Sequence, residues 1–117
     1  MSSYDLHRAI NITKNTIGYH EIGNAMILKF LDSGFEVRSM LDTKIIVEAS
    51  DKINGDPITV AMSCFDDLVN EYHDQINDAL NCVGFINGYV DGDVLPATGL
   101  MVFVIPIPDS RKYEIIF

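Results

Sequence analysis

The chain has 117 residues, of which 48% are hydrophobic and 21% are charged, and this composition is typical of a folded protein rather than a disordered one. Its length suits a single domain, residues 1–117, that can bury a sizeable core without disulfide or metal staples. The formal net charge of −9 argues against direct binding to nucleic-acid phosphates or to anionic lipid, because both need clustered basic residues.

The negative charge is confined to one half of the sequence. Residues 53–110 contain nine acidic residues and no Lys or Arg, whereas the rest of the chain contains eight acidic and eight basic residues. This separation favours a protein partner with a basic surface.

The cysteines do not indicate a metal site, and the sequence shows no targeting signal. Cys64 and Cys82 are too few and too far apart for a zinc pattern, so we expect free thiols and no metal or other cofactor. The first fourteen residues lack the apolar core of a signal peptide, and no apolar run approaches the roughly 18 residues of a membrane span. We therefore expect a cytoplasmic protein, in a cell or in an infected host, with no membrane contact.

The N-terminal third predicts two helices. Leu6, Ala9 and Ile10 begin an apolar face that extends to Ile17, which predicts a first helix over about residues 4–16. A second helix is predicted over residues 19–33. Its apolar face, residues 22–31, is so wide that we expect burial by the sheet and by either the first helix or a second subunit.

From Phe35 onward, apolar residues recur with a period of two. This pattern predicts a hairpin of two strands, residues 35–40 and 45–49, and Gly34 fits the left-handed position that ends the preceding helix. After the turn signal Asn54-Gly55, the alternation through residues 58–62 predicts a third strand, so that the three form a meander.

The clearest helical pattern in the sequence covers residues 63–83. Its apolar residues fall on one side of a helix, about 120° wide, and Ser63 stands where an N-cap hydroxyl would lie. The opposite side carries four carboxylates without an intervening base, at Asp67, Glu71, Asp74 and Asp78.

The C-terminal third predicts further strands around a long loop. Residues 84–99 are rich in glycine and predict a loop with, at most, a short strand near residues 85–90. Residues 100–105 are apolar on both faces, which predicts a central strand, and Pro106 and Pro108 then place the chain at the margin of the sheet. A polar turn over residues 109–112 leads to a final strand over residues 113–117.

These elements predict an α+β two-layer domain, with a mainly antiparallel sheet of about five strands and helices on one face. The predicted order of helix, three-strand meander, helix and further strands is similar to that of the secretion chaperones of type III systems, which dimerise and bind extended segments. The resemblance covers element order and no residue motif.

Candidate binding residues lie in two places. Four carboxylates over about 16 Å of helix approach the spacing of phosphates on one DNA strand, so the face of Asp67, Glu71, Asp74 and Asp78 could engage a basic surface. A solvated helix face is the alternative interpretation. In the long loop, Tyr89 is a candidate interface anchor and Asp91 and Asp93 are candidate polar contacts.

Catalysis has little support in the sequence, and we name no catalytic residue. The three histidines are scattered and pair with no cysteine within a predicted helix. Our leading hypothesis is a non-enzymatic inhibitor or immunity-type protein, with a phage as one candidate source, that uses the acidic face. The alternatives are a homodimeric or larger chaperone or joining subunit that uses residues 22–31, and a small enzyme with a site under residues 84–99.

Overall fold

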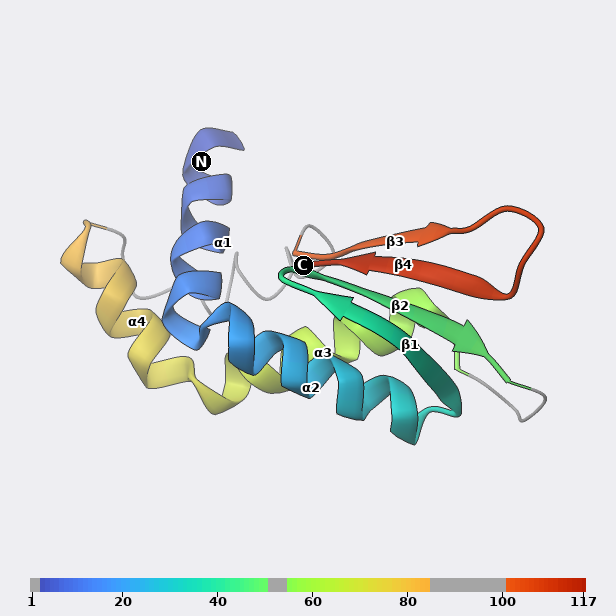
Figure 1. Cartoon of the computed structure of the whole chain (residues 1–117). Helices are drawn as coiled ribbons and strands as arrows, with labels where there is room; N and C mark the ends of the chain where they lie inside the picture. Colours follow the sequence, from blue (N-terminus) through green and yellow to red (C-terminus); the bar gives the residue numbers. More distant parts are fainter. Residues whose placement is uncertain (1–2, 51–54, 85–100) are drawn as a thin grey trace.

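The computed structural model describes residues 3–50, 55–84 and 101–117 of a molecule 47 Å long and 24 × 23 Å in cross-section. In this part of the chain four helices accompany a four-stranded antiparallel sheet with the strand order β1-β2-β4-β3 (Figure 1). The predicted α+β fold is confirmed, with four strands in place of about five.

The first two helices begin and end within one residue of their predicted bounds. Helix α1 covers Ser3–Ile17 and helix α2 covers Tyr19–Asp32. Gly34 has the predicted left-handed conformation, with φ at 91°, which residues with a Cβ rarely adopt. Phe35 follows it and packs edge-on against Phe30, with 5.2 Å between ring centroids, so the end of α2 is fastened to the start of the sheet.

The predicted hairpin is confirmed, as strands β1 (Phe35–Leu41) and β2 (Lys44–Ala49). A bulge between Val37 and Ser39 inserts Arg38 into β1 and shifts the alternation of side chains by one residue. Met40 therefore lies opposite Ile45 and on the same face as the helices. An added Cβ at Gly23 of α2 would lie 2.7 Å from the Met40 Cε, so the missing side chain of Gly23 makes room for Met40.

The predicted third strand is wrong, because residues 58–62 belong to helix α3 (Pro57–Glu71). The Asp56 carboxylate caps this helix by accepting hydrogen bonds from the Thr59 N–H, at 3.2 Å, and from the Thr59 hydroxyl, at 2.9 Å. Pro57 occupies the first helical position, where its fixed φ suits a helix and its missing N–H costs nothing. Ser63, the predicted N-cap, lies inside α3.

The single helix predicted over residues 63–83 is also two helices. Helix α4 (His73–Cys82) follows α3 after Tyr72, whose φ of −101° and ψ of 20° depart from helical values. The Tyr72 N–H still donates to the Leu68 carbonyl, and the Ile76 N–H donates to the Tyr72 carbonyl, both at 2.9 Å. The chain thus passes from one helix to the next without an intervening loop. Both cysteines are free thiols, as expected.

The predicted central strand is wrong in its position. Strand β3 (Phe103–Pro106) forms an edge of the sheet, and β2 and β4 (Lys112–Ile116) are central. Phe103 and Ile105 are 63% and 46% exposed, because they lie on the face of the sheet that turns away from the helices. The end of β3 at Pro106, the polar turn after it and the final strand are confirmed.

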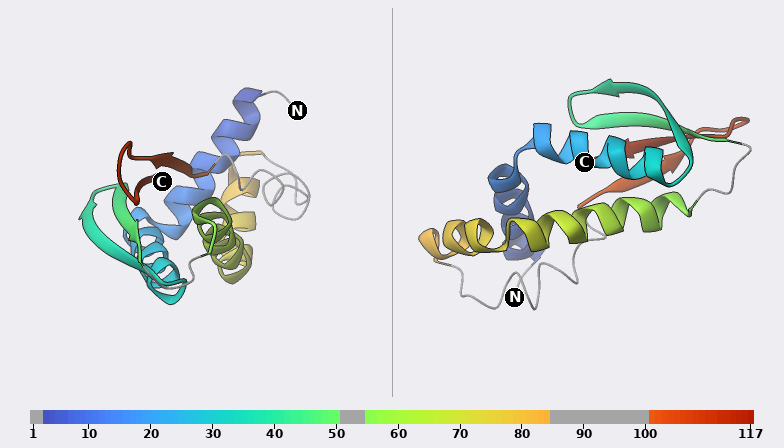
Figure 2. Two further views of the ribbon diagram at one scale, coloured as in Figure 1. Left: turned by 90° about the vertical axis from the view of Figure 1, so that its right-hand side faces the viewer. Right: turned by 90° about the horizontal axis from the view of Figure 1, so that it is seen from below.

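The core lies between one face of the sheet and helices α2 and α3, and Figure 2 shows both helices on that side. Helix α1 packs mainly against α4 beyond one end of the sheet, which accounts for the length of the molecule (Figure 1). The largest fully buried side chains are Ile22, Met26, Phe30, Ile45, Val47, Phe65, Val69, Ile76, Leu80, Met101 and Ile115.

Since helix, sheet and helix meet in this core, the two-sided burial expected for α2 is supplied by the sheet and chiefly by α3 rather than α1. The observed order, α-α-β-β-α-α-β-β in the described residues, lacks the three-strand meander. The resemblance to type III secretion chaperones depended on that meander, so the structure does not support it.

Candidate functional site

The four carboxylates of the predicted acidic face lie on the solvent side of α3 and α4. Asp67 and Glu71 belong to α3 and Asp74 and Asp78 to α4, and all four residues are exposed. The side chain of Asp74 is 97% exposed and that of Asp67 is 67% exposed. These residues are called the acidic face below.

One cation from another helix reaches the acidic face. The Lys29 ammonium of α2 donates a hydrogen bond of 2.9 Å to the Asp67 carboxylate, and this bond raises the pKa of Lys29. The contact holds α2 against α3 at the surface. The expectation that no cation neighbours these carboxylates is therefore wrong at Asp67. The spacing of residues within one helix cannot show which side chains a neighbouring helix contributes.

The other three carboxylates have no such partner in the described part of the chain. The His73 Nδ1 lies 3.4 Å from an Asp74 carboxylate oxygen, and no Lys or Arg of that part forms an ion pair with Glu71, Asp74 or Asp78. The C-terminal portion of the acidic face thus presents negative charge that is not neutralised within the described fold.

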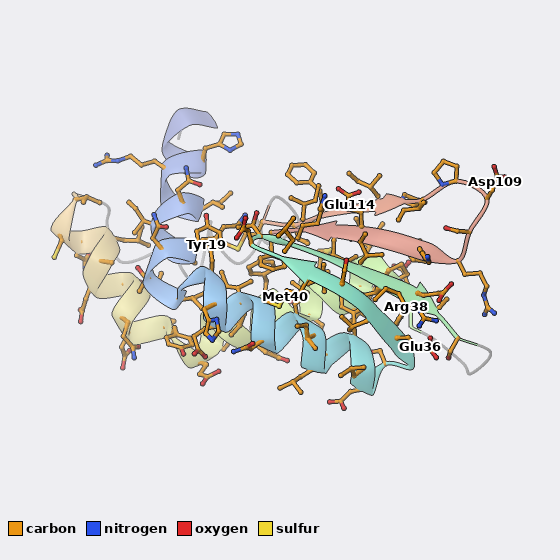
Figure 3. The ribbon with its side chains drawn as sticks, viewed as in Figure 1. Tyr19, Glu36, Arg38, Met40, Asp109 and Glu114 are labelled. Carbon is orange, nitrogen blue, oxygen red and sulfur yellow. The ribbon has the colours of Figure 1, made fainter. Side chains whose placement is uncertain are left out.

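Two basic side chains of the sheet pair with carboxylates of the sheet. The Arg38 guanidinium pairs with Glu36 and Glu48 at 2.5 Å each, and the Lys44 ammonium lies 3.5 Å from Glu114. Figure 3 labels Glu36, Arg38 and Glu114, and it shows Glu114 on the side of the sheet away from the helices. The charges of the sheet are balanced locally, whereas those of α3 and α4 are not.

A buried lysine lies where α1 meets α3. Lys14 is 9% exposed, its ammonium lies 5.9 Å from the centroid of the Phe65 ring, and burial lowers its pKa. This lysine removes one more positive charge from the surface. It was not singled out in the sequence, because a Lys in the last turn of a helix is ordinarily solvated there.

Cys64 is a buried free thiol of α3. Burial raises the pKa of the Cys64 thiol to about 12, so this cysteine is not a nucleophile at neutral pH. Within residues 3–50, 55–84 and 101–117, no three His, Cys, Asp or Glu side chains are grouped closely enough to hold a metal ion. Among those same residues, no helix is both long and apolar enough to cross a membrane.

A hollow of about 480 Å³ lies between the start of α2 and the turn that joins β1 to β2. Met40 forms part of its wall only because the bulge at Arg38 turns it towards α2, and nothing in the sequence signals that bulge. The hollow opens to solvent, and of its polar side chains Tyr19, His20 and Asp42 are exposed and Thr43 is half-buried. It is lined by Tyr19, His20, Met40, Asp42 and Thr43, of which Figure 3 labels Tyr19 and Met40.

Three predicted binding residues, Tyr89, Asp91 and Asp93, lie outside the described residues, as does the loop predicted over residues 84–99. The hypothesis of an enzyme with a site under that loop therefore stays a prediction. No family model matches the chain, and neither a curated protein nor a solved structure matches it.

Proposed function

We propose that this chain is a non-enzymatic binding protein, an inhibitor or immunity-type protein, whose acidic face engages a basic surface of a target protein. The supporting observation is that Glu71, Asp74 and Asp78 are exposed along α3 and α4 and pair with no Lys or Arg of the described residues. Asp67 lies at the other end of the face and keeps its bond to Lys29.

The spacing of these charges suits a flat basic surface. The acidic face spans about 16 Å at the helical rise of about 1.5 Å per residue, so neighbouring carboxylates are about 4.5 to 6 Å apart along the helix axes. A protein surface that binds nucleic acid contacts phosphates that lie about 3.4 Å apart along a strand. A target of that kind is attracted at long range, which speeds encounter, and it meets carboxylates at a comparable spacing.

The test is affinity capture from host-cell lysate with three forms of the chain: the wild type, Glu71→Lys on the acidic face, and Glu21→Lys in the first turn of α2. Both variants change the net charge equally at an exposed helical glutamate. We expect a captured protein that is lost with Glu71→Lys and kept with Glu21→Lys. Its capture should also fall at least about tenfold between roughly 50 and 500 mM salt, because screening weakens exposed charge contacts.

The purified target then allows the affinity to be measured directly. Glu71→Lys should weaken binding by about 1 to 2 kcal/mol, as expected for reversing a charge that faces an opposite one. Capture that is indifferent both to salt and to Glu71→Lys would rule out the acidic face as the binding surface.

A further inference from the structure

The face of the sheet that turns away from the helices is solvent-exposed and ordered in rows. Residues that lie opposite one another on neighbouring strands share a face, and three such rows follow from the strand register. The first row is Leu41, Lys44, Ile116 and Phe103, the second is Ser39, Ile46, Glu114 and Ile105, and the third is Glu36, Glu48 and Lys112. These residues, together with Arg38 of the bulge, are called the open face.

The open face combines exposed apolar side chains with a balance of charge. Leu41 and Phe103, at the two ends of the first row, are 65% and 63% exposed, and Ile105 is 46% exposed. Its charged residues are three acidic and three basic, so it is neutral in a molecule of net charge −9. The open face is thus a surface on which two such acidic molecules can meet without local repulsion between like charges.

The rows are complementary to themselves. Two copies can stack their open faces around a two-fold axis that lies between the two sheets. This axis runs parallel to the strands and midway between β2 and β4. The axis places β1 over β3 of a second copy and β2 over β4 of that copy. Leu41 then faces Phe103 of the second copy, and Glu48 faces Lys112 of the second copy. The first row thus pairs its apolar ends and the third row pairs opposite charges, while Lys44 lies over Ile116 and Glu114 lies over Ile46 of the second copy.

We propose that the open face is the interface of a homodimer in which two sheets pack face to face. The spacing of about 10 Å and rotation of about 30° that are usual for packed sheets apply here. The helices then lie on the outside, and the dimer presents two acidic faces.

The edges of the sheet are poor alternatives for self-association. The Phe117 N–H donates to the Thr43 carbonyl at 2.8 Å, and the Ile107 N–H donates to the Lys112 carbonyl at 3.0 Å. By the alternation of the ladder, the backbone of Val104 and Pro106 therefore points to the outer edge of β3, where proline has no N–H to donate. The other edge, β1, is interrupted by the bulge at Arg38.

The size of the face predicts a weak dimer. The strands β1, β2, β4 and β3 contain seven, six, five and four residues, which at about 3.4 Å per residue and about 4.8 Å between strands give a footprint of roughly 360 Å². Stable complexes bury about 800 Å² per partner, so we expect a dissociation constant of about 10 to 100 µM.

Sedimentation equilibrium of the full chain tests the proposal. Between about 5 and 500 µM, the wild type should change from mainly monomer to mainly dimer, as the expected dissociation constant requires. Phe103→Glu, at an exposed edge position, should remain monomeric throughout. Glu21→Lys on α2 and the double variant Leu28→Glu/Leu31→Glu, on the exposed side of the same helix, should dimerise like the wild type. A wild type that is monomeric at about 500 µM overturns the proposal, and so does a dimer lost only in the Leu28/Leu31 variant.

A charge exchange separates contacts between copies from contacts within one chain. Glu48→Lys and Lys112→Glu each place like charges across the proposed interface, so each variant alone should be monomeric. In an equal mixture, Lys at position 48 of one chain faces Glu at position 112 of the other, and the second pair is the native one. The mixture should therefore recover the dimer, which no effect within a single chain can produce. Failure of the mixture to dimerise overturns the proposed arrangement.

Discussion

At the scale of single residues, Lys14 is a buried charged side chain whose burial opposes its charged form. Its ammonium gains contact with the Phe65 ring, worth about 0.5 to 1 kcal/mol at an exposed site, yet burial still lowers its pKa. The loss of hydration opposes this favourable contact. Lys14 is tolerated in the core because its long stem fills space between α1 and α3.

Lys14→Met should stabilise the fold by about 1 kcal/mol near pH 7, because the methionine keeps the packing and removes the charge. In the wild type the native pKa lies below the unfolded value of 10.5, so the unfolded chain binds more protons between the two. Wild-type stability therefore rises with pH across that window, and the advantage of the variant should shrink towards pH 10. Urea unfolding at about pH 7 and about pH 10 measures both effects.

Lys29→Met is the matched control, with the opposite sign. The hydrogen bond to Asp67 raises the pKa of Lys29, so this lysine adds stability that is fully present below the unfolded pKa and is lost above the native one. Its removal should lower stability slightly at neutral pH, since exposed pairs contribute little. A Lys14→Met variant that is less stable than the wild type near pH 7 would show that packing or the ring contact outweighs desolvation.

At the scale of elements, the start of α3 decides how the middle of the chain folds. Asp56→Ala should destabilise the protein by about 1 kcal/mol, because the Thr59 N–H loses its acceptor. Ser63→Ala should change stability by less than about 0.5 kcal/mol, because Ser63 is an interior helical position where alanine is favoured. Thermal or urea unfolding of both variants gives the comparison. A larger loss for Ser63→Ala would mean that the helix begins at residue 63.

The same region shows which parts of the fold can be predicted from sequence and which cannot. Helices α1 and α2, the β1–β2 hairpin and strand β4 follow from local apolar spacing and from turn residues such as Gly34, and they were predicted closely. Ile58 and Val60 favour a strand by their branched side chains and alternation. The cap formed by Asp56 and Pro57 and the packing of α3 against α2 outweigh that preference.

Features that depend on tertiary contacts could not be predicted from local apolar spacing and turn residues. The exposure of the acidic face follows from the spacing of Glu71, Asp74 and Asp78, and it is observed. The bond from Lys29, the bulge at Arg38 and the edge position of β3 each depend on a neighbouring element, and no local pattern encodes a neighbour. The apolar β3 that suggested a central strand instead supplies the exposed Phe103 and Ile105 of the open face.

At the scale of the whole molecule, positive and negative charges are unevenly distributed. Helices α3 and α4 carry five carboxylates and no Lys or Arg, and Lys29 of α2 pairs with one of them, Asp67. The sheet carries its own balanced pairs, at Arg38 and Lys44. Such a separation costs stability, because like charges three or four residues apart on a helix each destabilise it by about 0.2 to 0.5 kcal/mol.

This cost predicts how the fold responds to salt. Three neighbouring pairs lie along the acidic face from Asp67 to Asp78. Lys29 offsets part of the charge of Asp67 and Tyr72 interrupts the helix between Glu71 and Asp74, so their repulsion totals at most about 1 kcal/mol. Salt screens this repulsion, so the Tm of the dilute monomer should rise by about 3 °C between roughly 20 and 500 mM NaCl. Differential scanning calorimetry at several salt concentrations measures the trend.

The double variant Glu71→Gln/Asp78→Asn separates this repulsion from general effects of salt. It removes the charges that belong to all three pairs while keeping side chains of nearly the same size, so its Tm should be higher than that of the wild type at low salt and should vary less with salt. A wild-type Tm that falls as salt rises would mean that the ion pairs of the sheet contribute more than the acidic face costs. If the Tm rises as expected, the unpaired negative charge lowers the stability of the isolated fold. A basic partner that binds the acidic face would then raise that stability.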